Sequence, residues 1–195
     1  MSPDDCDTVG SVMGESGTTG VSRLLGVELG FQPLLFKGDR HAVGTAMIGW
    51  GDSGLSARTL RWRKMRSRSG LFDEFAAALQ FPLYFGENMN AFNECIADLE
   101  TLPAGEGYVL TIVKPDQLLA DEDAGALEWL VRSLQSAAET WSHPIDLCEW
   151  WDRPAVPLHV VLAGETETIE LAAGRWSRAG LTPISWVNES ERPSE

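Results

Sequence analysis

Cysteine and histidine are scarce in this sequence of 195 residues, and their scarcity limits the chemistry that it supports. The three cysteines are odd in number, lie far apart and form no CxxC pair: Cys6, Cys95 and Cys148. This pattern favours free thiols over a disulfide framework. The three histidines show no HxxxH spacing, so no metal-ligand motif is present. We therefore expect no metal site and no cofactor, and the free thiols indicate a reducing, cytoplasmic location.

Long apolar runs and glycine-rich phosphate loops are also missing. The sequence has no run of 18 apolar residues, and its first residues are acidic and polar, so we expect neither a membrane-spanning helix nor a secretion signal. It has no GxSxG motif either, and we expect that the chain is not an enzyme. A hydrolase using Cys148 and His159 is a weaker alternative, which rests on their nearness in sequence. The neighbouring Trp150 and Trp151 are expected to cover a sheet edge or to form a subunit contact.

Positive charge is scarce as well, and it is unevenly placed. The chain carries 15 Lys and Arg against 29 Asp and Glu, a formal net charge of −14 at pH 7. Nine basic and seven acidic residues precede Leu71, a balance of +2, whereas six basic and 22 acidic residues follow from Leu71 onward, a balance of −16. Such a negative field repels nucleic acids and membrane surfaces and attracts basic proteins. We therefore expect a basic protein as partner, with no nucleic-acid and no membrane binding.

Residues 1–54 are predicted to form an N-terminal extension whose role the sequence does not reveal. Residues 1–20 are rich in Gly, Ser, Thr and Asp without periodicity, which predicts a disordered tail. Residues 21–50 hold apolar clusters interrupted by glycines, a pattern that favours short strands or hairpins over helices. The GDSG at 51–54 indicates a turn.

Residues 55–170 alternate between strand and helix patterns and are predicted to form one domain. Strands are expected at 57–69, 107–114 and 158–163, and helices at 70–81 (with Ser69 as N-cap), 89–100 and 124–141. The basic run within 57–69 includes one Trp, which favours a solvated strand over an RNA-binding stripe. This order predicts an α/β fold, with a three-stranded, mainly parallel sheet packed with three to four helices. Residues 171–195 are expected to be an extension or tail, after a further short strand at Thr168–Ala172.

The segment FPLYFGENMNAFNECIADLE, residues 81–100, is the candidate binding site. Gly86 supplies a backbone shape closed to most residues, and Asn88 is a good N-cap for the helix that follows. One side of that helix carries apolar residues at spacings of three and four: Phe92, Cys95, Ile96 and Leu99. The other side is small or polar and adjoins the loop bearing Tyr84; its polar residues are Asn90, Asn93, Glu94 and Asp98. Carboxylates held outward beside an aromatic side chain are suited to mimic phosphate.

This segment resembles the loop and second helix of the barstar family, intracellular inhibitors of small secreted ribonucleases. The matching positions are Phe81-Pro82, Tyr84, Phe85, Gly86, Asn88, Ala91, Glu94-Cys95 and Asp98-Leu99. The resemblance covers about residues 57–164, and its motifs are dense only in 81–100. It implies an inhibitor that occludes the active site of a basic ribonuclease, with acidic side chains mimicking the RNA phosphate. Glu94 would then fill the cationic site, surrounded by contacts from Tyr84, Asn88, Asn90, Asn93 and Asp98.

Three positions depart from the family's founding inhibitor. Glu94 is one methylene longer than the aspartate found there, Asn90 replaces an acidic residue, and Asn93 replaces a large aromatic residue. We therefore expect a related, barnase-like secreted ribonuclease as target, rather than barnase itself. Glu139 is a candidate for a second acidic contact. An immunity or regulatory module with a non-nuclease partner is the alternative on the same scaffold.

Overall fold

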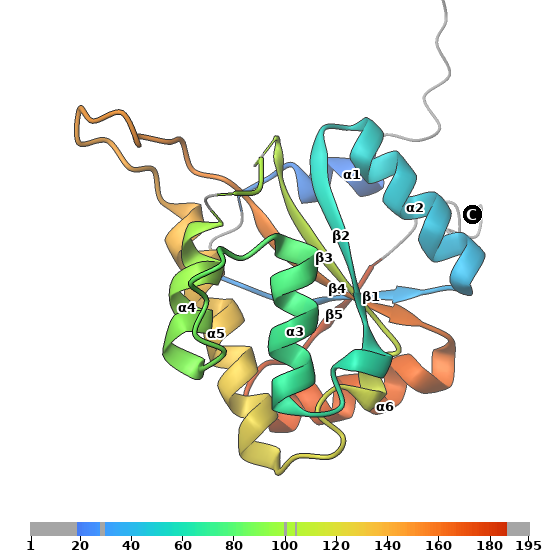
Figure 1. Ribbon diagram of the computed structural model, residues 1–195. Coiled ribbons are helices and arrows are strands. Elements are labelled where there is room, and N and C mark those ends of the chain that lie inside the picture. The colour runs from blue at the N-terminus through green and yellow to red at the C-terminus, as the bar shows by residue number, and fades with distance from the viewer. Residues whose placement is uncertain (1–18, 28–29, 100, 104, 187–195) are drawn as a thin grey trace, which may run out of the picture.

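The computed structural model describes residues 19–27, 30–99, 101–103 and 105–186 and builds them around a parallel β-sheet (Figure 1). The strands are β1 (Leu34–Lys37), β2 (Leu55–Arg61), β3 (Gly107–Val113), β4 (Leu158–Gly164) and β5 (Ile184–Ser185). The helices are α1 (Thr19–Leu24), α2 (Arg40–Asp52), α3 (Arg68–Leu79), α4 (Met89–Asp98), α5 (Ala124–Ser142) and α6 (Thr166–Arg178). The strands lie in the order β2-β3-β4-β1-β5, and each neighbouring pair is parallel.

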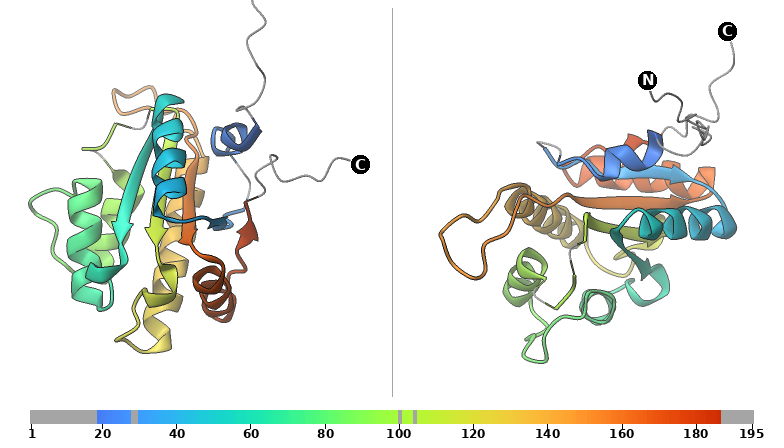
Figure 2. Two further views of the ribbon diagram at one scale, coloured as in Figure 1. Left: turned by 90° about the vertical axis from the view of Figure 1, so that its right-hand side faces the viewer. Right: turned by 90° about the horizontal axis from the view of Figure 1, so that it is seen from above.

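The sheet lies between two layers of helices (Figure 2). One apolar cluster joins α3, α4, α5 and α6 to one face of the sheet, where Leu110 and Leu162 lie. The other cluster joins α1 and α2 to the opposite face, where Val109 and Val161 lie. Neighbouring residues of β3 and β4 thus enter different clusters, as the two-residue period of a strand requires. Parallel strands are stable in this arrangement because both of their faces are buried.

The sheet has five strands rather than the predicted three. The predicted strands correspond to β2, β3 and β4, but the strand predicted at 57–69 ends at Arg61, and Trp62–Lys64 form a 3-10 turn instead. β1 and β5 extend the sheet beyond β4, where Leu34 is aligned with both Val161 and Ile184. The two additional strands have four and two residues, too few for a detectable alternation of polarity. They lie within the predicted N-terminal extension and C-terminal tail. The division into a domain and two extensions stays a prediction, but residues from all three segments build the sheet.

Two further predictions of secondary structure are wrong. Residues 40–52 form helix α2 rather than strands or hairpins; Asp39 begins it by accepting a hydrogen bond from the Ala42 amide at 2.8 Å. The helix tolerates its three glycines because Val43 and Trp50, two turns apart, bury its inner side. Residues 168–172 belong to helix α6 rather than to a strand, since the buried residues of this segment continue at helical spacing: Ile169, Ala172 and Trp176. Of the disordered tail predicted at residues 1–20, residues 1–18 lie outside the described residues, whereas residues 19 and 20 belong to helix α1.

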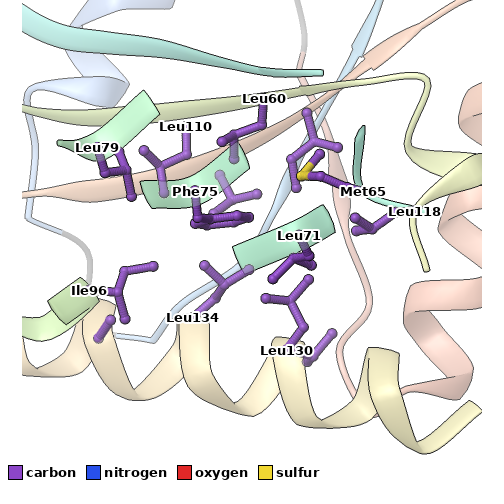
Figure 3. Packing of buried hydrophobic residues seen from close by; sticks show 14 of the residues in the cluster. Leu60, Met65, Leu71, Phe75, Leu79, Ile96, Leu110, Leu118, Leu130 and Leu134 are labelled. Atoms are coloured by element: carbon purple, nitrogen blue, oxygen red, sulfur yellow. The ribbon is translucent and has the colours of Figure 1, made fainter. Parts of the chain in front are cut away.

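Helix α3 packs on β2 beside α5, which packs on β4, and the end of α3 sets the start of the loop that follows. In Figure 3, Phe75 of α3 lies between Leu110 of the sheet and Leu134 of α5. The N-cap is Ser67 rather than the expected Ser69, which lies inside the helix. The helix ends at Leu79, two residues earlier than predicted, and the next residue adopts a left-handed backbone conformation. The chain therefore turns away from α3 before it reaches Pro82.

Glu74 is a buried carboxylate that fastens α3 to the end of β2. Its Oε1 accepts hydrogen bonds from the backbone N and the Nε of Arg61, both at 2.8 Å, and its Oε2 accepts one from Nη2 at 2.8 Å. Burial alone raises the pKa of Glu74, but these hydrogen bonds and the positive charge of Arg61 outweigh it, so the pKa lies below its ordinary value. The ion pair thus has a structural role.

The described residues contain a buried thiol at Cys95 of α4 and an exposed one at Cys148, both free; Cys6 lies outside them. Within the same ranges, no helix is both long enough and apolar enough to cross a bilayer. No group of three or more described His, Cys, Asp or Glu side chains is arranged to hold a metal ion.

We predict that truncating Trp50 destabilises the entire sheet. Trp50 of α2 is buried and packs against Phe36 and Trp186, with ring centroids 6.1 Å and 5.9 Å away. Trp50→Ala should lower the free energy of unfolding by about 3–5 kcal/mol, measured by denaturant titration. Ile48→Ala in the same helix is the control, because Ile48 is 68% exposed and its loss should cost less than about 0.5 kcal/mol. An unchanged stability of Trp50→Ala would show that α2 is an independent appendage.

Candidate protein-binding site

An aromatic cluster holds the loop between α3 and α4. Phe81 and Phe85 contact each other edge to face, with ring centroids 5.1 Å apart, and Phe85 also packs on Phe72 of α3 at 6.0 Å. The amide of Phe85 donates to the carbonyl of Pro82 at 2.9 Å and closes a turn. The two residues inside this turn, Leu83 and Tyr84, point outward, and Tyr84 is 77% exposed. The inner residues of the loop therefore anchor it while Tyr84 faces solvent.

Asn88 begins α4 as predicted. Its Oδ1 accepts hydrogen bonds from the amides of Asn90 at 3.1 Å and Ala91 at 3.0 Å, and its Nδ2 donates to the carbonyl of Gly86 at 3.1 Å. A Cβ on Gly86 would lie 2.9 Å from that Nδ2, so a larger residue here would displace the capping side chain of Asn88. Gly86 does not adopt the backbone shape closed to most residues that was expected there; the left-handed residue is its neighbour Glu87, with φ at 47°. The side chain of Asn88 thus organises both the loop and the helix start.

The two sides of α4 match the sequence pattern. Its apolar residues, with Leu99 at the cap, are all buried: Phe92, Cys95, Ile96 and Leu99. All six predicted partner-binding residues are exposed at their positions in the loop or on the helix: Tyr84, Asn88, Asn90, Asn93, Glu94 and Asp98. Of these, Asn88 already uses its side chain as the cap, so the remaining five carry most of the polar surface available to a partner.

Three of the six residues meet at a concavity between the loop and α4. Tyr84, Glu94 and Asp98 line this depression of about 150 Å³ together with Pro82 and Thr101. The hydroxyl of Thr101 donates a hydrogen bond to the carbonyl of Gln80 and links its two walls. Asn90 and Asn93 do not line it and lie farther along the exposed side of α4. The structure therefore brings together the aromatic residue and both carboxylates.

Neither carboxylate has an ion-pair partner among the described residues. Burial raises the pKa of the neighbouring Cys95 thiol, and the negative charges of Glu94 and Asp98 raise it further. Among the described residues, none that lines the concavity is basic. Its lining is therefore negatively charged, which suits a partner that presents several cationic groups.

Two buried aromatic residues anchor the C-terminal end of α4. The hydroxyl of Tyr108 in β3 donates to the carbonyl of Leu102 at 2.9 Å, and the Nε1 of Trp141 in α5 donates to the carbonyl of Ile96 at 3.1 Å. Their rings contact each other edge to face with centroids 5.1 Å apart. Burial raises the pKa of Tyr108 to about 12. No sequence pattern had indicated that these two residues position the site.

A family model described as Barstar (barnase inhibitor) matches residues 55–163, more than half of the chain. The chain belongs to the barstar family. The matched region contains β2, β3, β4, α3, α4 and α5, and thus the whole candidate site. This confirms the resemblance read from residues 81–100.

Two other comparisons say nothing about the function of this barstar-family chain. No curated protein matches it significantly. Among solved structures, a crystal structure of Cdc6p from Pyrobaculum aerophilum aligns with a TM-score of 0.49 and 13% sequence identity. The alignment covers 92% of this chain and 48% of that one, so the chain spans about half the length of the aligned protein. At this level of similarity the match supports no functional statement.

The other residues singled out from the sequence lie elsewhere in this barstar-family fold. Glu139 is exposed on α5 and lines a different cavity, of about 220 Å³, together with His143 and His159. His159 is buried in β4, whereas Cys148 lies exposed in a loop and does not line that cavity. The structure thus does not bring together the pair considered for a hydrolase, and it places Glu139 outside the concavity of Glu94.

We predict that Asn88 acts first as a helix cap. Asn88→Ala should lower the free energy of unfolding by about 1 kcal/mol, because two amide groups at the start of α4 lose their acceptor. Asn88→Asp keeps an acceptor there and should retain most of the stability, as measured by thermal or denaturant unfolding. Equal losses for the two variants would mean that the amide group has a role other than capping.

A second prediction concerns stability at alkaline pH. The unfolded Tyr108 side chain ionises near pH 10, whereas the folded protein holds its pKa at about 12, so the neutral form is favoured by folding. Its contribution is therefore complete below pH 10 and is lost as pH rises toward 12, by roughly 2–3 kcal/mol. The unfolding free energy of the wild type should fall more steeply over this range than that of Tyr108→Phe. Parallel curves for the two proteins would contradict the raised pKa.

Proposed function

We propose that this barstar-family chain inhibits a basic secreted ribonuclease by covering its active site. The concavity of Tyr84, Glu94 and Asp98 is the centre of the contact, and the carboxylate of Glu94 takes the place of an RNA phosphate. The exposed amides of Asn90 and Asn93 contact the partner around it. On this proposal the chain catalyses nothing itself and protects the cell that makes the nuclease.

The observation that carries the proposal is that two carboxylates stay exposed and unpaired beside an aromatic side chain on a fixed support. A carboxylate whose purpose is structural is expected to resemble Glu74, which is buried and paired with Arg61. Glu94 and Asp98 show the opposite environment. Their solvation is lost on binding, and only a partner that supplies several hydrogen-bond donors and positive charge compensates for that loss.

The chemistry of a ribonuclease active site meets this requirement. Such a site stabilises the charge of a transferring phosphate with cationic and hydrogen-bonding groups. The two oxygens of a carboxylate accept the same donors through short, charge-assisted hydrogen bonds. The overall charge of −14 also accelerates the encounter with a basic enzyme at low ionic strength.

The identities at three positions bear on which nuclease is bound. The longer side chain of Glu94 reaches farther from α4 than an aspartate would, and Asn90 and Asn93 offer amides where the founding inhibitor has an acidic and an aromatic residue. These changes favour a barnase-like enzyme with a differently shaped cleft over barnase itself. They also keep one alternative open, an immunity or regulatory module that uses the same surface for a non-nuclease protein.

Titration of purified chain into basic secreted bacterial ribonucleases, barnase included, tests the proposal. The wild type should abolish RNA cleavage by at least one enzyme at a one-to-one ratio. Glu94→Gln keeps the shape of the side chain but removes its charge and should raise the inhibition constant by at least about tenfold, through the loss of charge-assisted hydrogen bonds. Inhibition by the wild type should also weaken as NaCl rises from 50 to 500 mM, because salt screens exposed charges.

Glu170→Gln is the matched control, because it removes the same charge from an exposed position on α6. It should inhibit like the wild type. A wild type that leaves every nuclease active, or a Glu94→Gln variant that inhibits equally well, would show that the proposed role of Glu94 is wrong.

A further inference from the structure

Residues 145–153 form a hairpin that projects from the body of the protein between α5 and β4 (Figure 1). The backbones of Ile145 and Arg153 pair through reciprocal hydrogen bonds of 2.8 Å and 3.0 Å and close its base. Its tip exposes three large apolar side chains: Leu147 is 67%, Trp150 87% and Trp151 46% exposed. The expectation that the two tryptophans cover a sheet edge is therefore wrong. Such a cluster is unfavourable in water and is typical of a binding surface.

The hairpin is ordered in advance of any contact. The carboxylate of Asp152 accepts hydrogen bonds from the amides of Leu147 at 3.0 Å and Glu149 at 3.2 Å, and thereby fixes the turn. The rings of Trp150 and Trp151 contact each other edge to face with centroids 5.3 Å apart. An apolar tip held in one conformation loses little entropy on binding, so it gains affinity from the surface that it buries.

Arg153 ties the hairpin to the end of α5. Its guanidinium donates to the carbonyls of Thr140 at 3.0 Å and His143 at 3.0 Å, and it lies 4.1 Å from the ring centroid of Trp141. These contacts satisfy carbonyl groups that the last turn of a helix leaves without partners. The one arginine of the hairpin is thus committed to its base, and the charges that remain on the projecting part are acidic: Asp146, Glu149 and Asp152.

The base of the hairpin is continuous with the support of the candidate site. Trp141, on which Arg153 stacks, donates its indole hydrogen bond to Ile96 of α4. Asp98 lies near enough to oppose electrostatically the lowering of the Arg153 pKa that burial causes. In the view from above, the hairpin projects to the left of α4 and the loop of residues 80–88 projects below it, so that α4 lies between the two (Figure 2).

We propose that this hairpin is a second contact for the same basic protein that the Glu94 concavity binds, with Trp150 as its apolar anchor. This inference rests on the proposed function. Acidic side chains around an apolar tip fit a partner whose surface offers an apolar pocket rimmed by Lys or Arg. The same negative charges disfavour anionic lipid and nucleic acid. Two separated contacts on one partner raise affinity and restrict the range of partners accepted.

The first test compares Leu147→Ala/Trp150→Ala with Ile48→Ala, using the ribonuclease that the wild type inhibits most strongly. Ile48 is the apolar control, because it is as exposed as Leu147 but lies on α2, which covers the opposite face of the sheet from α4. The hairpin variant should raise the dissociation constant by at least about tenfold, mainly through faster dissociation, while Ile48→Ala leaves it unchanged. Both variants should keep wild-type unfolding curves, because only exposed side chains are removed.

The exposed thiol of Cys148 provides a second readout at the hairpin itself. In a Cys6→Ser background, iodoacetamide should modify Cys148 faster than the buried Cys95. Saturating ribonuclease should slow the modification of Cys148 by at least about fivefold. Saturating ribonuclease should not change the rate at which iodoacetamide modifies a thiol introduced on α2 by Thr45→Cys, in a chain that also carries Cys148→Ser.

The outcomes separate this inference from the function on which it rests. If the wild type inhibits no ribonuclease, the proposed function fails and the hairpin contact fails with it. If the Glu94→Gln variant loses inhibition but the hairpin variant inhibits normally with Cys148 unprotected, only the hairpin contact is wrong. Dimerisation of the free wild type that Trp150→Ala abolishes, or Trp150-dependent binding to phosphatidylcholine vesicles, would assign the hairpin to another occupant and overturn the inference.

Discussion

The exposed carboxylates of Glu94 and Asp98 depend on how firmly the opposite side of α4 is held. A helix of ten residues is only marginally stable in water on its own, so tertiary contacts must fix it. Phe92 enters a cluster of aromatic rings beneath α4, and the indole of Trp141 binds the backbone at Ile96. With one side fixed in this way, the other side can present unpaired charge in a constant geometry. Binding a partner then requires little further ordering of this surface, because folding has already fixed its conformation.

The part of the chain that matches the barstar family depends in turn on segments outside it. Residues 55–163 supply β2, β3 and β4 and the helices that carry the site, but one face of these strands is covered by α1 and α2. The edge of β4 that faces away from β3 is paired with β1, and β5 is paired with the other edge of β1. A buried parallel strand such as β4 requires both the helices that cover this face and the neighbouring strand. The N-terminal and C-terminal segments thus support the sheet on which the site is built.

Local signals account for what the sequence predicts correctly. The β-branched and apolar residues of β3 and β4, the helical spacing in α5 and the cap at Asn88 each act over a few neighbouring residues, and these elements lie where expected. The core side of α4 follows from the positions of Phe92 and Ile96 alone. The exposure of Glu94 follows from the same spacing, which is why the candidate site could be identified without a structure.

The features that the sequence does not predict depend on distant contacts. Strands β1 and β5 are too short for a periodic pattern, and the glycines of α2 conceal a helix whose inner side is set by Val43 and Trp50. Tyr108 and Arg153 act on carbonyl groups that are brought near only by folding. The exposure of Trp150 contradicts the usual burial of its residue type and has no local signal. Candidate binding residues could thus be predicted where they lie on one helix, but not where several elements must fold together to bring them near one another.

The central claim is that Glu94 occupies a cationic catalytic cleft in place of phosphate. A crystal structure of the chain bound to a ribonuclease that it inhibits tests this most directly. In that complex the Glu94 carboxylate should lie within hydrogen-bond distance, about 2.7–2.9 Å, of arginine, lysine or histidine nitrogens of the enzyme's active site. A complex in which that carboxylate stays in solvent while another surface contacts the enzyme would contradict it.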